Sequence, residues 1–401
     1  MKLLLVIFLC FLTSCSETPT KVQIAWPKQN NLNDYEFINV ELPNLKDLTT
    51  LSGKNFSFMG AQNHYGVESY NKTKNFNSFD NMYSTLRSDL SSKTVKLNLE
   101  AIGDTYMANS FESLLMLTAY YAFEDIRQKA KTYFKIDSKA FSEFISIGVY
   151  PGWVYSKEYP LPILTNDNAM YSASVDAIFI LGVGDQSGLP YALNIGIFGH
   201  EYFHRIFHKQ VWQNPNYDLW PFFKSSILKE HETEIEKRSQ FLLSATDEGL
   251  ADLFAVAYSA NPEFMSVSLT GKNELIVKEH RSLINEFARI ATYENLEEKT
   301  LDKKWLKYCN KNYYCLGTVI AKTFYMAAQN DIDILRNEIL PLIPYGLEAI
   351  SRNFSQKRLY SFPILLNAIV MNAPSALKNN LCQAYNQKFH SLMGQISTCI
   401  P

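Results

Sequence analysis

The chain has 401 residues, a formal net charge of −2 and a hydrophobic fraction of 47%. This length is enough for one large core or for two packed subdomains. The nearly balanced charge provides no basic field for nucleic acid, so we expect no nucleic-acid partner. The sequence also contains no P-loop, no Gly-rich dinucleotide loop and no G-x-S-x-G elbow.

The first feature along the chain is a short apolar run at the N-terminus. Lys2 precedes an apolar segment over 3–12, and Leu12-Thr13-Ser14 leads to Cys15. This pattern resembles the signal peptide and lipobox of bacterial lipoproteins. The resemblance implies that residues 1–14 are removed and that lipid on Cys15 holds the protein at a membrane. The alternative is a simple secretory signal in which Cys15 is incidental.

Residues 15–30 are expected to form a tether between the lipid and the folded part. They are mostly polar and contain Pro19 and Pro27, a composition typical of extended linkers. Ser16 follows the cysteine in place of an aspartate. By resemblance to known sorting rules, this indicates the outer membrane of a bacterial cell envelope.

The segment 31–209 is expected to form an N-terminal α+β subdomain. Strand-like runs alternate with turns up to about residue 107, and apolar residues then recur at helical spacing over 109–134. Strands are expected at 144–149 and 175–182, and a helix at 192–209. Beyond it, 210–401 is expected to be a helical C-terminal subdomain.

The helix over 192–209 contains the most informative motif of the chain. His200-Glu201-Tyr202-Phe203-His204 is an HExxH sequence, and residues i and i+4 of a helix lie on one face. Two neutral imidazoles on that face can bind one zinc ion, which needs a third protein ligand and a water to be catalytic. Glu201 is then the general base for that water. The alternative is an amphipathic helix with two buried, hydrogen-bonded histidines.

A second acidic motif follows in Asp247-Glu248-Gly249-Leu250-Ala251-Asp252. It lies in a segment expected to be helical over 246–260, with Ser244 or Thr246 as the N-cap. Glu248 and Asp252 are four residues apart and share one helical face. The alternative interpretation is that acidic residues favour the first turn of a helix because of its dipole.

Together the two motifs resemble those of the gluzincin metallopeptidases, and of the thermolysin-like enzymes in particular. The resemblance implies a thermolysin-like α+β fold with one zinc ion on His200, His204 and Glu248. It also implies that Asp252 holds a ligand histidine in the right tautomer. Glu248 lies much further from His204 than in thermolysin itself, although other gluzincins also have long spacers. The acidic clusters that bind calcium in thermolysin have no clear match, so calcium stays open.

The same resemblance gives a role to a strand upstream of the zinc helix. Asp167-Asn168-Ala169-Met170-Tyr171 looks like the Asn-Ala-aromatic edge strand of thermolysin-like enzymes. An edge strand has unpaired backbone groups that can bind an extended peptide. Asn168 and Ala169 are therefore expected to contact the substrate; an ordinary turn-to-strand junction is the alternative.

Downstream, thermolysin-like enzymes place a catalytic histidine shortly before a helix that starts with glycine. Here the helix expected over 316–330 follows Tyr313 and Tyr314, and no histidine is near. One of the two tyrosines is expected to donate to the oxyanion instead, with packing beside a disulfide as the alternative. His208 is expected to be solvated or to contact a metal ligand. His231 and His280 have no assigned place.

Six cysteines include Cys10, in the signal segment, and Cys15. The even number that remains suggests two disulfides in an oxidising compartment, with three possible pairings. The shortest loops are closed by Cys309–Cys315 and Cys382–Cys399.

The sequence therefore predicts a zinc-dependent endopeptidase that is anchored to a bacterial envelope and acts on a polypeptide substrate. Its cleft lies between the subdomains 31–209 and 210–401. The alternative is a catalytically silent surface lipoprotein that uses the same fold for binding. The intact Glu201 counts against this alternative, because a binding protein gains nothing from a general base.

Overall fold

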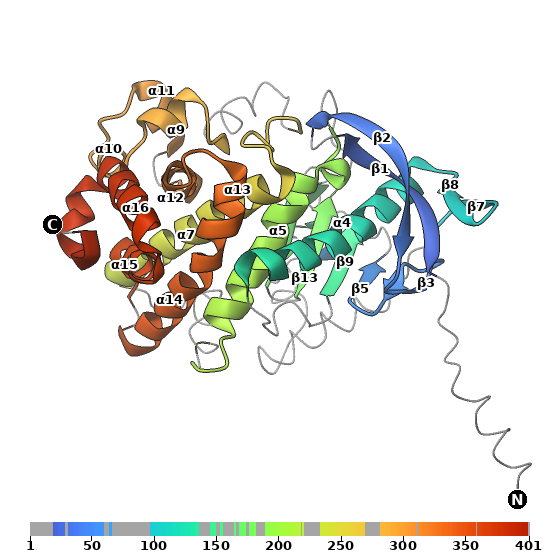
Figure 1. Ribbon diagram of the computed structural model, residues 1–401, viewed down its shortest axis with the longest axis horizontal. Helices are drawn as coiled ribbons and strands as arrows, with labels where there is room; N and C mark the ends of the chain where they lie inside the picture. The colour runs from blue at the N-terminus through green and yellow to red at the C-terminus, as the bar shows by residue number, and fades with distance from the viewer. Residues whose placement is uncertain are drawn as a thin grey trace, which may run out of the picture.

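The computed structural model describes the larger part of the chain, with the strands in the N-terminal half and most of the helices in the C-terminal half (Figure 1). The expected α+β fold class is confirmed. Among the described helices, none is long and apolar enough to cross a membrane. The described residues are 19–28, 31–59, 64–65, 97–135, 145–149, 153–154, 164–165, 168–173, 176–181, 189–217, 219, 233–268, 281–309, 312–357 and 359–399.

The N-terminal sheet has the strand order β2-β1-β8-β7. Its second strand corrects one expectation: β1 (Thr20–Lys28) lies inside the sheet, so the predicted tether over 15–30 is wrong for these residues. Val22 and Ile24 alternate on one face and are fully buried, and β1 packs against helix α4 (Phe111–Phe134). Burial of every second side chain stabilises a strand here, although the segment as a whole is polar in composition. The other strands are β2 (Asn31–Leu42), β7 (Leu99–Ile102) and β8 (Thr105–Ala108).

A second sheet has the order β12-β13-β9-β5-β4-β3. Strand β12 (Asn168–Ser172) is at the edge of this described sheet, as the sequence predicted, and pairs antiparallel with β13 (Ala177–Leu181). Strand β13 runs parallel to β9 (Ile145–Val149). The remaining strands are β3 (Leu45–Asp47), β4 (Ser52–Gly53) and β5 (Phe56–Met59), with β6 (His64–Tyr65), β10 (Trp153–Val154) and β11 (Leu164–Thr165) in a three-stranded sheet.

Two helices cross at the centre of the molecule and pack on each other, α5 (Ile195–Phe207) and α7 (Glu234–Ser259) (Figure 1). Helix α7 is one continuous helix, whereas the sequence predicted a separate helix that starts near residue 246. Its N-cap is Thr233, which forms a capping box with Glu236. Thr246 donates to the carbonyl of Leu242 at 2.9 Å inside the helix, so the expected N-cap at Ser244 or Thr246 is wrong.

The C-terminal half consists of further helices, several of them short. Within the described residues 281–296 the chain forms two short helices, because Asn285 and Thr292 each cap a new helix. The two disulfides are Cys309–Cys315 and Cys382–Cys399, which close the shortest loops. The helices are α9 (Glu286–Ile290), α10 (Tyr293–Glu297), α11 (Lys303–Cys309), α12 (Tyr313–Ala327), α13 (Ile332–Ile334), α14 (Ile343–Lys357), α15 (Phe362–Asn372) and α16 (Ser375–Lys388).

Several short π-helical and 3₁₀-helical turns lie between the longer helices. A π-helical turn, His208–Trp212, continues α5 and crosses the expected subdomain boundary between 209 and 210. The other turns are Tyr191–Leu193, Leu335–Ile339, Leu340–Leu342, His390–Gln395 and Ser397–Cys399.

Candidate metal centre and active site

Helix α5 presents both histidines of the HExxH motif to one cavity. The side chain of Asn194 caps the helix by accepting from the main-chain N–H groups of Gly196 and Ile197. His200 and His204 then lie one turn apart, with ring centroids 4.5 Å from each other. Glu201 lines the same cavity and is buried. The local helix alone therefore brings three of the predicted site residues together.

Helix α7 supplies the acidic side of the site. Gly249 allows it to approach α12 closely, because a Cβ atom there would collide with the main-chain carbonyl of Gly317. This backbone-to-backbone contact lies directly beside Glu248. Asp247, Glu248 and Asp252 consequently face the two histidines of α5.

Three side-chain atoms converge as a metal site requires. The Nε2 atoms of His200 and His204 are 2.9 Å apart, and Glu248 Oε2 lies 3.3 Å from the first and 3.7 Å from the second. Zinc bonds of about 2.0–2.2 Å in a tetrahedron place neighbouring ligand atoms about 3.3–3.6 Å apart. The observed separations lie on either side of this range, so small side-chain adjustments let the three residues hold a zinc ion, and they form a potential metal-binding group among the described residues.

Two further carboxylates orient the imidazole rings. His200 Nδ1 lies 3.0 Å from Asp252 Oδ1, and His204 Nδ1 lies 2.9 Å from Asp247 Oδ1. The ionised form of Asp252 is favoured because Arg281 and His200 outweigh burial and lower its pKa. Asp247 remains 28% exposed and keeps contact with solvent. When each Nδ1–H donates to its carboxylate, the lone pairs of both Nε2 atoms are left to bind a metal ion.

The charges around the rings favour a cation between them. Burial lowers the pKa of His204, but the charges of Asp247 and Glu248 outweigh it and raise the pKa to about 10. For Glu248, burial raises the pKa, yet the histidines and Arg281 lower it overall. A carboxylate that stays ionised beside two imidazole lone pairs is the donor set that zinc prefers.

Glu201 has the properties of a general base. Burial raises its pKa, against the opposing effect of His200 and His204. A main-chain hydrogen bond from Tyr171 of β12 also reaches this carboxylate. A carboxylate with a raised pKa accepts a proton more readily near neutral pH than an exposed one does.

Arg281 is a site residue that the sequence analysis missed. Its Nε and Nη2 atoms bind the two oxygens of Asp252 at 2.9 and 2.5 Å, and Nη2 is 3.4 Å from Glu248 Oε2. The guanidinium also lies 4.8 Å from the centre of the Tyr314 ring. No motif marks this arginine in the sequence. By contrast, Asp247 could have been found, since it directly precedes Glu248.

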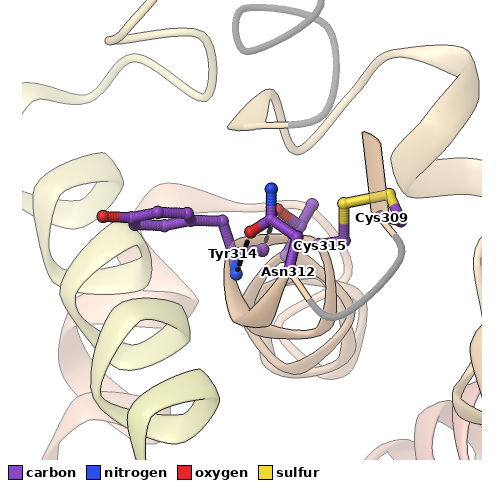
Figure 2. The surroundings of a disulfide bond; sticks show 5 residues. Cys309, Asn312, Tyr314 and Cys315 are labelled. Carbon is purple, nitrogen blue, oxygen red and sulfur yellow. Dashed lines mark hydrogen bonds between the residues drawn. A yellow bond between two sulfur atoms is a disulfide. The ribbon is translucent and has the colours of Figure 1, made fainter. Parts of the chain in front are cut away.

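The structure separates the two tyrosines that were candidates for the oxyanion donor. Tyr314 lines the cavity with the metal group, whereas Tyr313 packs against Tyr314 and Phe241. Figure 2 shows Tyr314 pointing away from the Cys309–Cys315 disulfide and toward the neighbouring helix. The charge of Glu248 and burial raise the pKa of Tyr314, so its hydroxyl stays protonated and can donate.

The remaining cavity wall comes from β12 and from the continuation of α5. The cavity has a volume of about 420 Å³, and Ala169 and Tyr171 line it. For Asn168 the structure describes the main chain only, as the first residue of β12. His208 is buried and lines the cavity, so the expectation of a solvated side chain is wrong. His231, His280 and Cys15 lie outside the described residues.

Comparison with known proteins gives little independent support. No family model matches the chain, and no curated protein matches it. Among solved structures, the precursor of protealysin, a metalloproteinase from Serratia proteamaculans, is similar with a TM-score of 0.42 and 15% identity. The similarity covers 74% of this chain and 82% of that chain.

Proposed function

We propose that this protein is a zinc-dependent peptidase of the gluzincin type. The observation that supports it best is the convergence of His200 Nε2, His204 Nε2 and Glu248 Oε2 on one point. Beside that point lies Glu201, a buried carboxylate with a raised pKa. A binding protein would have no use for such a group, because a buried carboxylate costs free energy unless it is paired.

Each side chain has a role in this proposal. Zinc held by His200, His204 and Glu248 would supply a Lewis acid that polarises the scissile carbonyl and lowers the pKa of a bound water. Glu201 accepts the proton of the attacking water and passes it to the leaving amine. Tyr314 donates its hydroxyl hydrogen to the oxygen that becomes negatively charged.

The substrate class is an extended polypeptide. Strand β12 is an edge strand of the described sheet, and its residues Ala169, Met170 and Tyr171 line the cavity. An extended peptide can add as a further strand beside such an edge strand. The proposal assigns this pairing to Asn168 and Ala169, and it makes no assignment of side-chain preference.

The first test is metal content together with hydrolysis. Protein comprising residues 16–401 should bind about one zinc per chain and cleave an unfolded protein substrate, because the donor set matches a catalytic zinc site. A chelator should abolish the cleavage, and added zinc should restore it. A protein that is saturated with zinc yet never cleaves would support the binding lipoprotein instead. A protein that cannot retain zinc would refute the metal site.

We also propose that lipid on Cys15 anchors the protein to the bacterial envelope, with the outer membrane as its location. Because β1 begins at Thr20, only residues 16–19 would separate the lipidated cysteine from the folded part. The globular domain would then lie close to the bilayer, within about 14 Å for four extended residues.

Cys15→Ser tests this anchor. The variant should lose labelling by fatty acid and keep its signal segment 1–14 uncleaved, because lipid attachment to the cysteine precedes cleavage in the lipoprotein pattern that the sequence resembles. Its peptidase activity should remain, since Cys15 is not part of the fold described above. A variant that is still labelled with fatty acid would contradict the lipobox assignment.

A further inference from the structure

A buried polar cluster outside the metal group connects the β12–β13 strand pair to α5. Asp176 directly precedes β13, and its carboxylate accepts from the Tyr171 hydroxyl at 3.0 Å, from Arg205 Nε at 3.0 Å and from Lys209 Nζ at 2.9 Å. The side chain of Arg205 is only 1% exposed, and those of Asp176 and Lys209 are 10% exposed. We call these four residues the Asp176 cluster.

The partners of Asp176 come from the two elements that define the candidate active site. Arg205 follows His204 in α5, and Lys209 lies one turn further along the same helical path. Tyr171 belongs to β12, lines the cavity and gives its main-chain hydrogen bond to Glu201. The cluster therefore links the strand that lines the cavity to the helix that carries the histidines.

The backbone and the charges both restrict residue 176. Its φ of 49° lies in the left-handed region, where aspartate and asparagine are the non-glycine residues most readily accommodated. Burial alone would raise the pKa of Asp176, but Arg205 and Lys209 outweigh it and lower the pKa to about 2. Asp176 is consequently ionised at neutral pH and holds both cations.

A role in stability alone explains such a cluster poorly. Taking charges out of water costs free energy that their attraction only partly offsets, so apolar packing could hold the strand equally well. What the cluster adds is a fixed geometry, because donors from one helix bind both oxygens of one carboxylate. That geometry determines how far β12 lies from α5.

We propose that Asp176 is a positioning residue that fixes the distance between the substrate-binding strand β12 and the helix α5. The catalytic consequence rests on the proposed peptidase function, whereas the attachment of the strand does not. Variants can therefore test the attachment of the strand separately from its effect on catalysis.

The chain offers a conservative variant and a matched control. Asp176→Asn keeps the size and tolerates the left-handed backbone, but it removes the charge. Asp125 of α4 has similar partners, since it accepts from the Tyr258 hydroxyl at 2.9 Å and from Lys129 Nζ at 2.9 Å. Asp125 does not line the cavity. Asp125→Asn is therefore the control for loss of a comparable carboxylate elsewhere.

Hydrogen exchange tests the attachment without any need for activity. In Asp176→Asn, the amides of β12 should exchange at least about 10-fold faster than in the wild type, as expected for local opening of a strand. Amides of β1 should be unchanged, and Asp125→Asn should leave β12 unchanged. Unaltered exchange in β12, or equal acceleration in all elements, would overturn the proposal. If Asp176→Asn does not fold, Lys209→Gln should show the same local pattern more weakly.

Kinetics test the catalytic consequence. For a peptide long enough to pair with β12, kcat/KM of Asp176→Asn should fall by about 100-fold, as for a misplacement of roughly 1 Å. A short substrate that does not reach β12 should lose much less, and zinc affinity should be unchanged. Equal losses for both substrates, or no loss, would overturn the positioning role. A wild-type protein that holds zinc but never hydrolyses peptides would instead refute the peptidase function, while hydrogen exchange still decides the attachment.

Discussion

Glu201→Gln should leave about one zinc bound per chain and lower kcat for peptide hydrolysis by at least about 100-fold, the lower range for loss of a general base. Glutamine has nearly the same shape, but it cannot accept the proton of the attacking water. The side chain is buried, so bulk water cannot easily reach the same position as a substitute base. The measurements are metal content and steady-state kinetics on one peptide substrate.

Substitutions of Tyr313 and Tyr314 should lower kcat to different extents, and both can be compared with Glu201→Gln. Tyr314→Phe should lower kcat by less than Glu201→Gln, because it removes one hydrogen-bond donor and leaves the base in place. Tyr313→Phe should have a smaller effect than Tyr314→Phe, since Tyr313 does not line the cavity and acts only through its hydrogen bond with the Tyr314 hydroxyl. Unchanged kcat in Glu201→Gln would mean that another base acts, and a larger loss in Tyr313→Phe would exchange the roles of the tyrosines.

The local part of the site could be predicted from sequence because helical geometry alone generates it. His200, Glu201 and His204 share one turn of α5, so their relation depends on the helix and not on the tertiary fold. The contact between Asp252 and a histidine of α5 was also anticipated, from the resemblance to gluzincins, and it is present at 3.0 Å.

Other parts of the site depend on tertiary contacts that leave no periodic signal. Arg281 reaches Asp252 from a segment 29 positions away, and no local pattern distinguishes it from a surface arginine. Asp176 likewise meets Arg205 only because the strand pair β12–β13 packs on α5 through β12. Burial of single charges of this kind cannot be inferred from neighbours in the chain.

Two expected features, the tether over 15–30 and the N-cap at Ser244 or Thr246, were wrong because the local sequence signal was ambiguous. Residues 20–28 appeared polar enough for a tether, yet Val22 and Ile24 bury one face of a strand pair. A short alternation of apolar residues is a weak signal when prolines and polar residues surround it. In α7, an internal threonine resembled an N-cap, although its hydroxyl is satisfied by the carbonyl of Leu242.

The carboxylates around the histidines should separate into one ligand and two supporting residues when zinc affinity is measured. Glu248→Ala should cause the largest loss, because it removes a bond to the metal. Asp252→Asn and Asp247→Asn should each weaken zinc by about 10–100-fold, since they only orient a ligand histidine. Competition with a chromophoric chelator measures all three on one scale.

Stability of the metal-free variants should then distinguish the two supporting residues. Asp252 is almost fully buried and forms a two-bond pair with Arg281. Asp252→Asn leaves the buried guanidinium with only the longer carboxylate contact to Glu248 at 3.4 Å, so it should cost about 3 kcal/mol of unfolding free energy. Asp247 pairs with His204 and is 28% exposed, so Asp247→Asn should cost at most about 1 kcal/mol. Urea unfolding in the presence of a chelator measures both. Zinc retained by Glu248→Ala but lost by Asp247→Asn would make Asp247 the third ligand, and the gluzincin donor set would then be wrong.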